Sequence, residues 1–401
     1  MDKVSIMKVY LLKFLTLLMI IFSLGSCSDP IFYLITEETP LIKPLIDGSP
    51  TKFAIFNNEM FVSTGKKLFY FNKNNKNKYG NIIWKEWERF DSFIVDLAST
   101  NSSLYVLYLN GSNGRIRRYY DDGNPDGYTA KEVNLSGNVQ SIFVSDDILF
   151  ACVRNNTTYT VFYKKESDSD FKEIPIKISD EPLNFIINGV ASDANYYYLS
   201  TYSGIFYVDR SDINSSSVID YSSVLPIKDK DNKIIMYFKG IINLNPNCAA
   251  AITINGVIYE ITNKMATEKI RFRDGRYSTG ALALWKDKDN PAKTLFLIGR
   301  REDYYSATSS YTNGYVEIEL DATGNIPADV KFAEPGKNPF STITGYDRYV
   351  SSLGKKLVNY FIQTPASIDP EMTLFAATHK DGCWSYRDHN DGEGVTWNAE
   401  K

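Results

Sequence analysis

The sequence predicts an all-β protein folded as a seven-bladed β-propeller of four-stranded antiparallel blades. Tyrosine and phenylalanine are abundant, with 28 and 23 copies among 401 residues, and their flat side chains pack well on a pleated sheet. Groups of short apolar strands recur along the chain, and seven groups in about 350 residues match the spacing of propeller blades. A single four-stranded unit cannot bury both of its faces, whereas units arranged around an axis cover one another.

Each repeat has a short apolar strand, a stronger aromatic and aliphatic strand, a turn into an alternating strand, and a polar outer strand. The first two units are the most regular, with strands expected at 53–56, 60–63, 68–71 and 83–87, then at 93–95, 104–108, 114–119 and 128–135. The next three have strands at 142–144, 148–151 and 160–163, at 197–200 and 204–208, and at 250–253 and 256–261. The last two have strands at 295–298 and 314–318, separated by a polar insertion at 304–312, and at 358–362, 374–378, 382–386 and 395–397. A set of β-sandwich domains with similar strand spacing is the alternative.

Glycine often precedes the third strand of a unit, as Gly114, Gly204, Gly256 and Gly382 do. We expect these residues to adopt the positive φ of a tight hairpin turn. The last unit should close the ring against the first, with Trp384 and Trp397 in its third and fourth strands.

Two segments do not fit the repeat. Residues 30–50 either add a strand to the last blade or form a tether, and residues 340–357 show the apolar spacing of a short helix.

The N-terminus has the three parts of an export signal in residues 1–26: early lysines, an apolar stretch from Phe14 to Leu24, and small residues at a cleavage region. The apolar stretch is about 11 residues long, whereas a membrane-spanning helix needs roughly 20. The residues Leu24-Gly25-Ser26-Cys27 directly follow and resemble the lipobox of bacterial lipoproteins. This resemblance implies cleavage before Cys27 and lipidation of its thiol. Two or three acyl chains would hold the protein stably at a bilayer.

This organisation divides the chain into a signal peptide (1–26), a lipidated N-terminus that is a tether or extra strand (27–50), and the propeller (51–401). The predicted location is the cell membrane or outer membrane, with the domain outside the cytoplasm.

Hydrophobic residues make up 43% and charged residues 23% of the chain, as in globular proteins. The formal net charge is -4 and there is no block rich in lysine and arginine, which argues against nucleic-acid binding.

The sequence offers no catalytic constellation, and we expect no catalytic residue, no cofactor and no metal site. After Cys27 only Cys152, Cys248 and Cys383 remain, and the first two lie in apolar stretches typical of buried thiols. The only histidines, His379 and His389, are expected at the surface. The Asp168/Asp170 and Asp229/Asp231 pairs are weak calcium candidates because calcium needs several converging oxygen ligands.

Two local resemblances concern the C-terminus. The segment 391–397, Asp-Gly-Glu-Gly-Val-Thr-Trp, resembles the Asp-box turn of sialidase-like and sortilin-like propellers, although its aspartate is one place early. That turn is structural in those families, and the residues of sialidase chemistry cannot be assigned here. The segments 382–388 and 397–400 are similar to the ending of spirochaete lipoproteins, particularly those of treponemes.

The expected function is a membrane-anchored, non-enzymatic β-propeller that binds a protein or peptide partner at the cell envelope. Propeller loops present a wide face, and tyrosine, asparagine, serine and aspartate in them suit adaptable contacts. The alternatives are a carbohydrate-binding protein or glycosidase-like enzyme that uses the propeller face, and an assembly scaffold of the outer envelope. A glycosidase would need two carboxyl groups in one cleft, about 5–5.5 Å or 6.5–9.5 Å apart.

Overall fold

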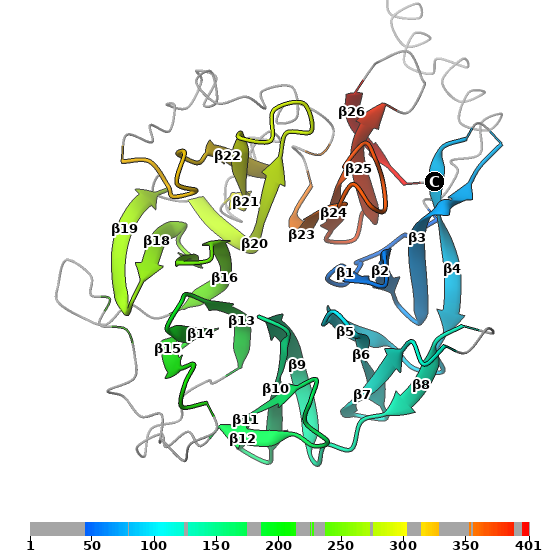
Figure 1. Cartoon of the computed structure of the whole chain (residues 1–401), viewed down its shortest axis with the longest axis horizontal. Coiled ribbons are helices and arrows are strands. Elements are labelled where there is room, and N and C mark those ends of the chain that lie inside the picture. Colours follow the sequence, from blue (N-terminus) through cyan, green and yellow to red (C-terminus); the bar gives the residue numbers. More distant parts are fainter. Residues whose placement is uncertain are drawn as a thin grey trace, which may run out of the picture. The chain divides into compact units, whose positions relative to one another are not determined.

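The computed structural model describes residues 45–400, apart from 79, 124–126, 175–185, 214–224, 226, 228–236, 273–275, 303–313, 329–352, 354–355 and 389–394. The described residues form seven antiparallel sheets, which follow one another in chain order around a common centre (Figure 1). The predicted all-β, seven-bladed propeller is therefore confirmed. Every regular element of these residues is a strand. None of their segments is a helix long and apolar enough to cross a membrane.

The blades are numbered in chain order, and each begins with its innermost strand. Blade 1 contains β1 (Ala54–Phe56), β2 (Glu59–Thr64), β3 (Lys67–Lys76) and β4 (Ile82–Arg89). Blade 2 contains β5 (Ile94–Ser99), β6 (Ser103–Asn110), β7 (Asn113–Tyr120) and β8 (Thr129–Glu132). Blade 3 contains β9 (Asn138–Ser145), β10 (Ile148–Asn155), β11 (Thr158–Lys165) and β12 (Lys172–Ile174). Blade 4 contains β13 (Ile187–Ser192), β14 (Tyr196–Thr201) and β15 (Gly204–Asp209).

The remaining blades complete the ring. Blade 5 contains β16 (Phe238–Asn245), β17 (Cys248–Thr253), β18 (Val257–Thr262) and β19 (Met265–Arg271). Blade 6 contains β20 (Arg276–Lys286), β21 (Thr294–Glu302) and β22 (Gly314–Glu319). Blade 7 contains β23 (Val358–Gln363), β24 (Leu374–Thr378), β25 (Cys383–Asp388) and β26 (Val395–Ala399). Five blades thus have four strands, while the described residues of blades 4 and 6 supply three each.

Seven apolar clusters hold the ring together, and each lies between two neighbouring blades. The cluster between blades 1 and 2, for example, joins Phe61 to Val106, and the one between blades 5 and 6 joins Ile252 to Phe296. Each second strand lies in the middle of a sheet that is covered on both faces, so β17 and β24 are buried along their whole length. The blades therefore depend on one another for burial, as the repeat predicted.

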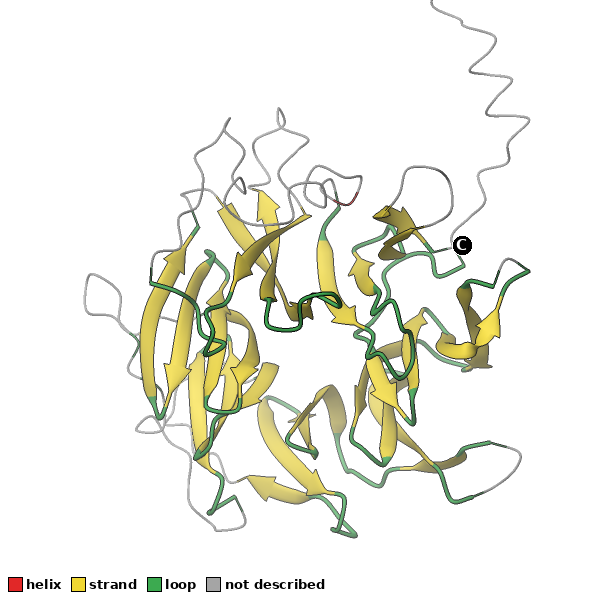
Figure 2. Ribbon diagram, turned by 45° about the horizontal axis from the view of Figure 1, so that its top comes forward, coloured by secondary structure: helices red, strands yellow, loops and turns green. Residues whose placement is uncertain are grey.

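The strands give the ring two faces, and connecting loops gather at both ends of the sheets (Figure 2). We call the side where the innermost strands begin the N-face and the side where they end the C-face. Because the strands are antiparallel, the turns between second and third strands lie on the N-face. The turns between first and second strands, and between third and fourth strands, lie on the C-face.

A β-bulge near the start of the innermost strand recurs in blades 2 to 7. Five of these bulges leave one residue out of the ladder, namely Val95, Gln140, Asn188, Lys239 and Asn359. A bulge bends the strand and redirects a side chain. The bends bring neighbouring backbones close together, so that a Cβ on Gly240 would lie 2.5 Å from the carbonyl oxygen of Gly280.

Hairpin glycines behave as predicted in blades 4, 5 and 7 but not in blade 2. Gly204, Gly256 and Gly382 have φ of 130°, 71° and 78°. Gly114 is not among the residues with positive φ, so the prediction for it was wrong. Glycine is needed there for space, because a Cβ on Gly114 would lie 1.9 Å from the carbonyl oxygen of Val139 in the next blade.

The ring closes between blade 7 and the N-terminal part of the described chain. The backbone N–H of Cys383 donates to Ile46 O at 3.0 Å, and that of Gly382 donates to Gly48 O at 2.8 Å. The N–H of Leu45 donates to Glu400 O at 3.1 Å. Residues 45–48 therefore join the last blade. The sequence alone had not decided whether residues 30–50 add a strand to that blade or form a tether.

Side chains reinforce the closure of the ring. The Arg387 guanidinium donates to both carboxylate oxygens of Glu400, at 2.9 and 3.0 Å, and to Ile82 O in blade 1 at 3.0 Å. On the other flank of blade 7, Trp397 is buried and its Nε1 donates to the Tyr315 hydroxyl in blade 6 at 3.1 Å. The predicted strand positions of Trp384 and Trp397 are confirmed.

Asp193 similarly connects blade 4 to blade 5. Its carboxylate accepts the backbone N–H groups of Asn195 and Tyr196 at 2.8 and 2.9 Å, and that of Asn263 in the next blade at 2.6 Å. It also accepts the Tyr198 hydroxyl. Burial acts to raise the pKa of Asp193, but these hydrogen bonds hold that pKa below its usual range.

Candidate functional site

The residues that carry candidate chemistry in the sequence do not form a reactive centre within the described structure. Cys152 and Cys248 are buried, as predicted, and form no disulfide, and burial raises the pKa of each thiol to about 11. Cys383 is also buried and free, and burial raises its pKa. His379 is exposed in the turn after β24, as predicted. The described residues contain no group of three His, Cys, Asp or Glu side chains placed to hold a metal ion.

Several predicted features lie outside the described residues. These are the signal segment 1–26 with Cys27, the segment expected to be helical up to residue 352, the Asp-box-like turn at 391–394, His389, and the Asp229/Asp231 pair.

Exposed apolar side chains gather on the N-face, at the starts of innermost strands. Six large hydrophobic residues are exposed in the described part of the chain, and four of them stand at the start of an innermost strand. These four are Phe93 (58% exposed), Val95 (43%), Tyr237 (59%) and Tyr360 (37%). They come from blades 2, 5 and 7 and lie at the N-face ends of the innermost strands. We call this set the aromatic rim.

Tyr237 shows backbone strain within the aromatic rim. Its φ is 71°, a left-handed conformation that is rare for a bulky residue and costs of order 1–3 kcal/mol. Two backbone hydrogen bonds hold it, because its N–H donates to Tyr202 O and its carbonyl accepts the N–H of Ile254, each at 2.9 Å. A strained residue that also exposes an aromatic ring is a candidate functional position.

An ion pair beneath the rim spans three blades. The Lys52 ammonium lies 2.8 Å from the Asp96 carboxylate of blade 2 and donates to Ile142 O of blade 3 at 2.7 Å. It also lies 3.7 Å from the centroid of the Phe143 ring. Burial lowers the pKa of Lys52 and raises that of Asp96, although their mutual attraction opposes both shifts. Because each charge has a partner of opposite sign, we interpret the pair as structural and not as a free reactive group.

Tyr360 connects this ion pair to the aromatic rim. Although Tyr360 is 37% exposed, its hydroxyl end is buried, and this burial raises the pKa of the hydroxyl, with further contributions from Asp96 and Tyr202. The Tyr202 hydroxyl in turn accepts a hydrogen bond from the Lys239 ammonium at 3.2 Å. Tyr360 of blade 7 is therefore close enough to Asp96 of blade 2 and Tyr202 of blade 4 to interact with them electrostatically.

A pocket of about 660 Å³ opens on the N-face over blades 5, 6 and 7. It lies at the starts of β16, β20 and β23, beside the aromatic rim. Its lining residues are Lys239, Ile254, Tyr277, Ser278, Thr279, Arg301, Leu357, Asn359, His379 and Lys380. We call it the N-face pocket. Its volume is in the range of small-ligand sites, roughly 300–1,000 Å³.

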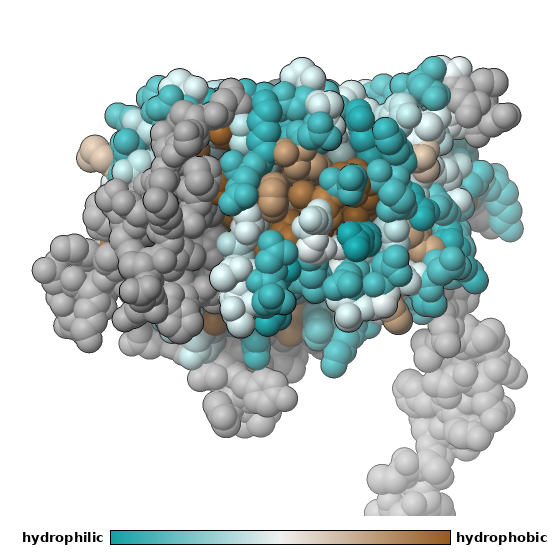
Figure 3. Space-filling model, turned by 90° about the horizontal axis from the view of Figure 1, so that it is seen from below, coloured by the Kyte–Doolittle hydropathy of each residue, from teal (hydrophilic) through white to brown (hydrophobic). Residues whose placement is uncertain are grey.

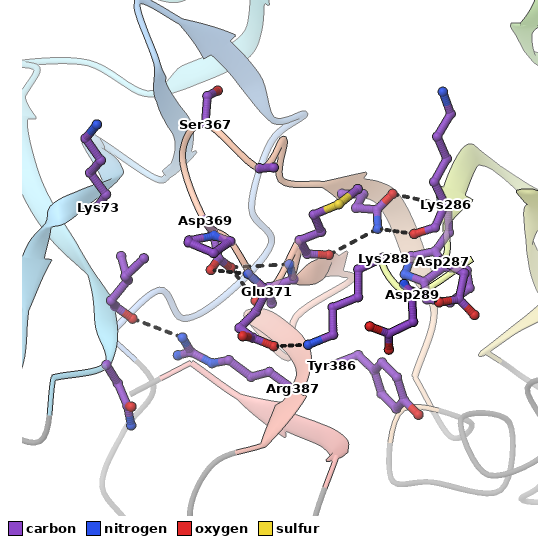
Figure 4. Close-up of a pocket in the computed structure, with 18 of the residues that line it drawn as sticks. Lys73, Lys286, Asp287, Lys288, Asp289, Ser367, Asp369, Glu371, Tyr386 and Arg387 are labelled. Atoms are coloured by element: carbon purple, nitrogen blue, oxygen red, sulfur yellow. Dashed lines mark hydrogen bonds and ion pairs between the residues drawn. The ribbon is translucent and has the colours of Figure 1, made fainter. Parts of the chain in front are cut away.

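A second, larger pocket of about 1140 Å³ lies on the C-face, between blades 6, 7 and 1. Figure 4 shows charged side chains of both signs around it, with Lys288 reaching Glu371 and with Tyr386 nearby. The Trp285 and Tyr386 rings also line it, although both pack partly against the apolar cluster between blades 6 and 7. We call it the C-face pocket.

The outer side of the ring carries one further apolar area. Figure 3 shows it surrounded by hydrophilic residues, on the side that lies at the bottom of Figure 1. The partly buried side chains that pack against the apolar cluster between blades 2 and 3 are Val133, Val144, Phe162 and Phe171. These four belong to the propeller interior.

Sequence reasoning missed the aromatic rim and both pockets. Phe93 and Tyr237 each stand just before an innermost strand, and an aromatic residue at that position is the signal that could have found the rim. The pockets have no such signal because their residues come from three blades each.

Comparison with known proteins agrees with the fold. No family model matches the sequence, and no curated protein is similar to it in sequence. Two structures of the extracellular domain of BT4673 from B. thetaiotaomicron, described as a hybrid two-component system and as a one-component system, are similar, with TM-scores of 0.54 and 0.52, each at 13% identity over 85% of this chain. The GH74 enzyme of Niastella koreensis has a TM-score of 0.50 at 11% identity over 89% of this chain. This chain spans 38% of each BT4673 chain and 55% of the GH74 chain. At these identities the similarities show the β-propeller fold alone.

Proposed function

We propose that the protein is a cell-envelope lipoprotein whose propeller binds a protein or peptide partner on the N-face without catalysing a reaction. Residues 1–26 are then the signal peptide and Cys27 is the lipidated residue. The observation that carries the binding role is the aromatic rim, because Phe93, Tyr237 and Tyr360 remain exposed on the N-face. Aromatic residues are enriched in protein interfaces, where they bury large areas.

The anchor is supported by the lipobox-like Leu24-Gly25-Ser26-Cys27 at the end of the apolar stretch. The similarity of the closing segment to spirochaete lipoproteins agrees with this assignment. Metabolic labelling with a fatty acid should mark the wild-type protein, and Cys27→Ala should abolish the label and release the protein from membranes. An unlabelled wild type would refute the anchor and leave the binding role to be judged separately.

The binding role can be tested by pull-down from native membranes with the full-length chain. A Phe93→Ser/Tyr237→Ser variant should lose the partners that wild type retains, because two anchors of the rim are removed. Met265→Ser is the matched control, since Met265 is also apolar and 72% exposed but lies at the start of β19 on the C-face. If the rim variant and the control retain the same partners as wild type, the N-face is not the binding surface.

A second candidate function is saccharide binding in the C-face pocket. It is favoured by the two aromatic rings, Trp285 and Tyr386, which share the pocket with Gln363, Lys288 and Glu371. Aromatic faces with hydrogen-bonding groups around them suit a polar, ring-shaped ligand. A glycan array with wild type and Trp285→Ala tests it, and equal signals from the two proteins would exclude the pocket.

A further inference from the structure

The described lining of the N-face pocket has an unbalanced charge. Lys239, Arg301 and Lys380 line it from three blades, together with His379, and none of the described lining residues is aspartate or glutamate. The C-face pocket differs in this respect, because Asp287, Asp289, Asp369 and Glu371 accompany its cations.

The three cations of the N-face pocket have no carboxylate partner within the described residues. Among the described residues, the Lys239 ammonium donates to the Tyr202 hydroxyl at 3.2 Å, and ion pairs of this part of the chain involve neither Arg301 nor Lys380. The aspartate nearest to Lys380 in sequence, Asp381, is already paired with Lys356 at 3.0 Å. Like charges that share one pocket repel each other, and an anion bound there would relieve the repulsion.

The position of the pocket identifies the kind of anion. Tyr237 of the aromatic rim stands two residues before Lys239, and Tyr360 directly follows Asn359 of the lining. A ligand that fills the pocket and extends beyond its lining would reach the part of the N-face where these aromatic rings are exposed. A peptide with a carboxylate beside apolar side chains fits both surfaces, whereas a small inorganic anion would use only the pocket.

We propose that the N-face pocket is an anion subsite that binds a side-chain or C-terminal carboxylate of the partner's peptide segment. This inference rests on the proposed function, because it names the chemistry of the partner that the aromatic rim would bind. Arg301 supplies a planar fork that can hold a carboxylate through two hydrogen bonds, while Lys239 and Lys380 act as point charges.

A random heptapeptide display library, panned on the purified full-length chain in detergent, tests the proposal. Wild type should enrich peptides that contain aspartate or glutamate together with apolar residues. Arg301→Gln/Lys380→Gln should abolish the acidic enrichment. Lys286→Gln/Lys288→Gln changes two cations of the C-face pocket and should preserve it. The best acidic peptide should bind the Arg301→Gln/Lys380→Gln variant at least about tenfold more weakly than wild type, which corresponds to about 1.4 kcal/mol.

The outcomes separate this inference from the proposed function. Apolar peptides without acidic enrichment, whose binding is lost in Phe93→Ser/Tyr237→Ser, would overturn the anion subsite and leave the proposed function standing. Acidic enrichment that persists in Arg301→Gln/Lys380→Gln would also overturn the subsite. If neither the wild type nor any variant enriches peptides, both the anion subsite and the proposed function are refuted. Complete displacement of the best peptide by inorganic phosphate at low millimolar concentration would show a general anion site and refute the peptide-specific assignment.

Discussion

Replacing Arg387 with methionine tests how the ring is closed. The Glu400 side chain is 2% exposed, and Arg387 is its ion-pair partner among the described residues, at 2.9 Å. Methionine would leave a buried carboxylate that retains only the Ser385 hydroxyl, and it would remove the donor to Ile82 O in blade 1. Removing one partner of a buried ion pair costs about 3–5 kcal/mol. Set against the total stability of a typical domain, about 5–15 kcal/mol, that loss should be large.

Urea unfolding of the full-length chain, followed by tryptophan fluorescence, measures the effect. Arg89→Met is the control, because Arg89 forms an ion pair with Glu86 but is 61% exposed, and exposed pairs contribute about 0–1 kcal/mol. In the double variant Arg387→Met/Glu400→Gln the buried charge is absent, so it should be more stable than Arg387→Met alone. The reasoning is wrong if Arg387→Met unfolds like Arg89→Met, or if the two substitutions at 387 and 400 are simply additive.

Three other predictions follow from the same structure. Deleting residues 381–401 removes β25 and β26 and should lower the melting temperature of the whole domain cooperatively, whereas trimming residues 28–36 should cost less; equal melting of full-length and C-terminally deleted proteins would contradict the closure. Asp193→Asn should destabilise the protein at pH 7 and flatten its pH dependence. The pKa of Asp193 is depressed in the folded state. The contribution of Asp193 to folding stability is therefore complete above the unfolded pKa of about 3.9 and is lost as the pH falls through the folded pKa. Unfolding free energies measured at pH 7 and pH 3 check this direction, and a wild type that loses no more stability than the variant between these two pH values would refute it. The three buried thiols should react with a thiol reagent only in denaturant, and rapid reaction of the native protein would show that the core is open.

The sequence by itself determined the number of blades and the identity of their middle strands. Strand alternation is a local property, and the second strands are the most apolar because both of their faces are covered, as in β17 and β24. It also placed Cys152 and Cys248 in the core, since apolar neighbours in a strand share its burial. The innermost strands of blades 4, 5 and 6 were not recognised. They carry glycine and polar residues, such as Gly189 and Gly240, because they face the ring axis.

The tertiary structure decided everything that depends on contacts between blades. Lys52 donates to Ile142 O across 90 residues of sequence, and Arg387 donates to Ile82 O across 305. Gly114 is required by the carbonyl of the next blade and not by its own turn. The aromatic rim and the two pockets arise in the same way, because the ring brings together the ends of strands from different repeats. No local sequence pattern predicts which strand ends from different repeats become neighbours. The candidate site could therefore be recognised only from the arrangement of the blades around their axis.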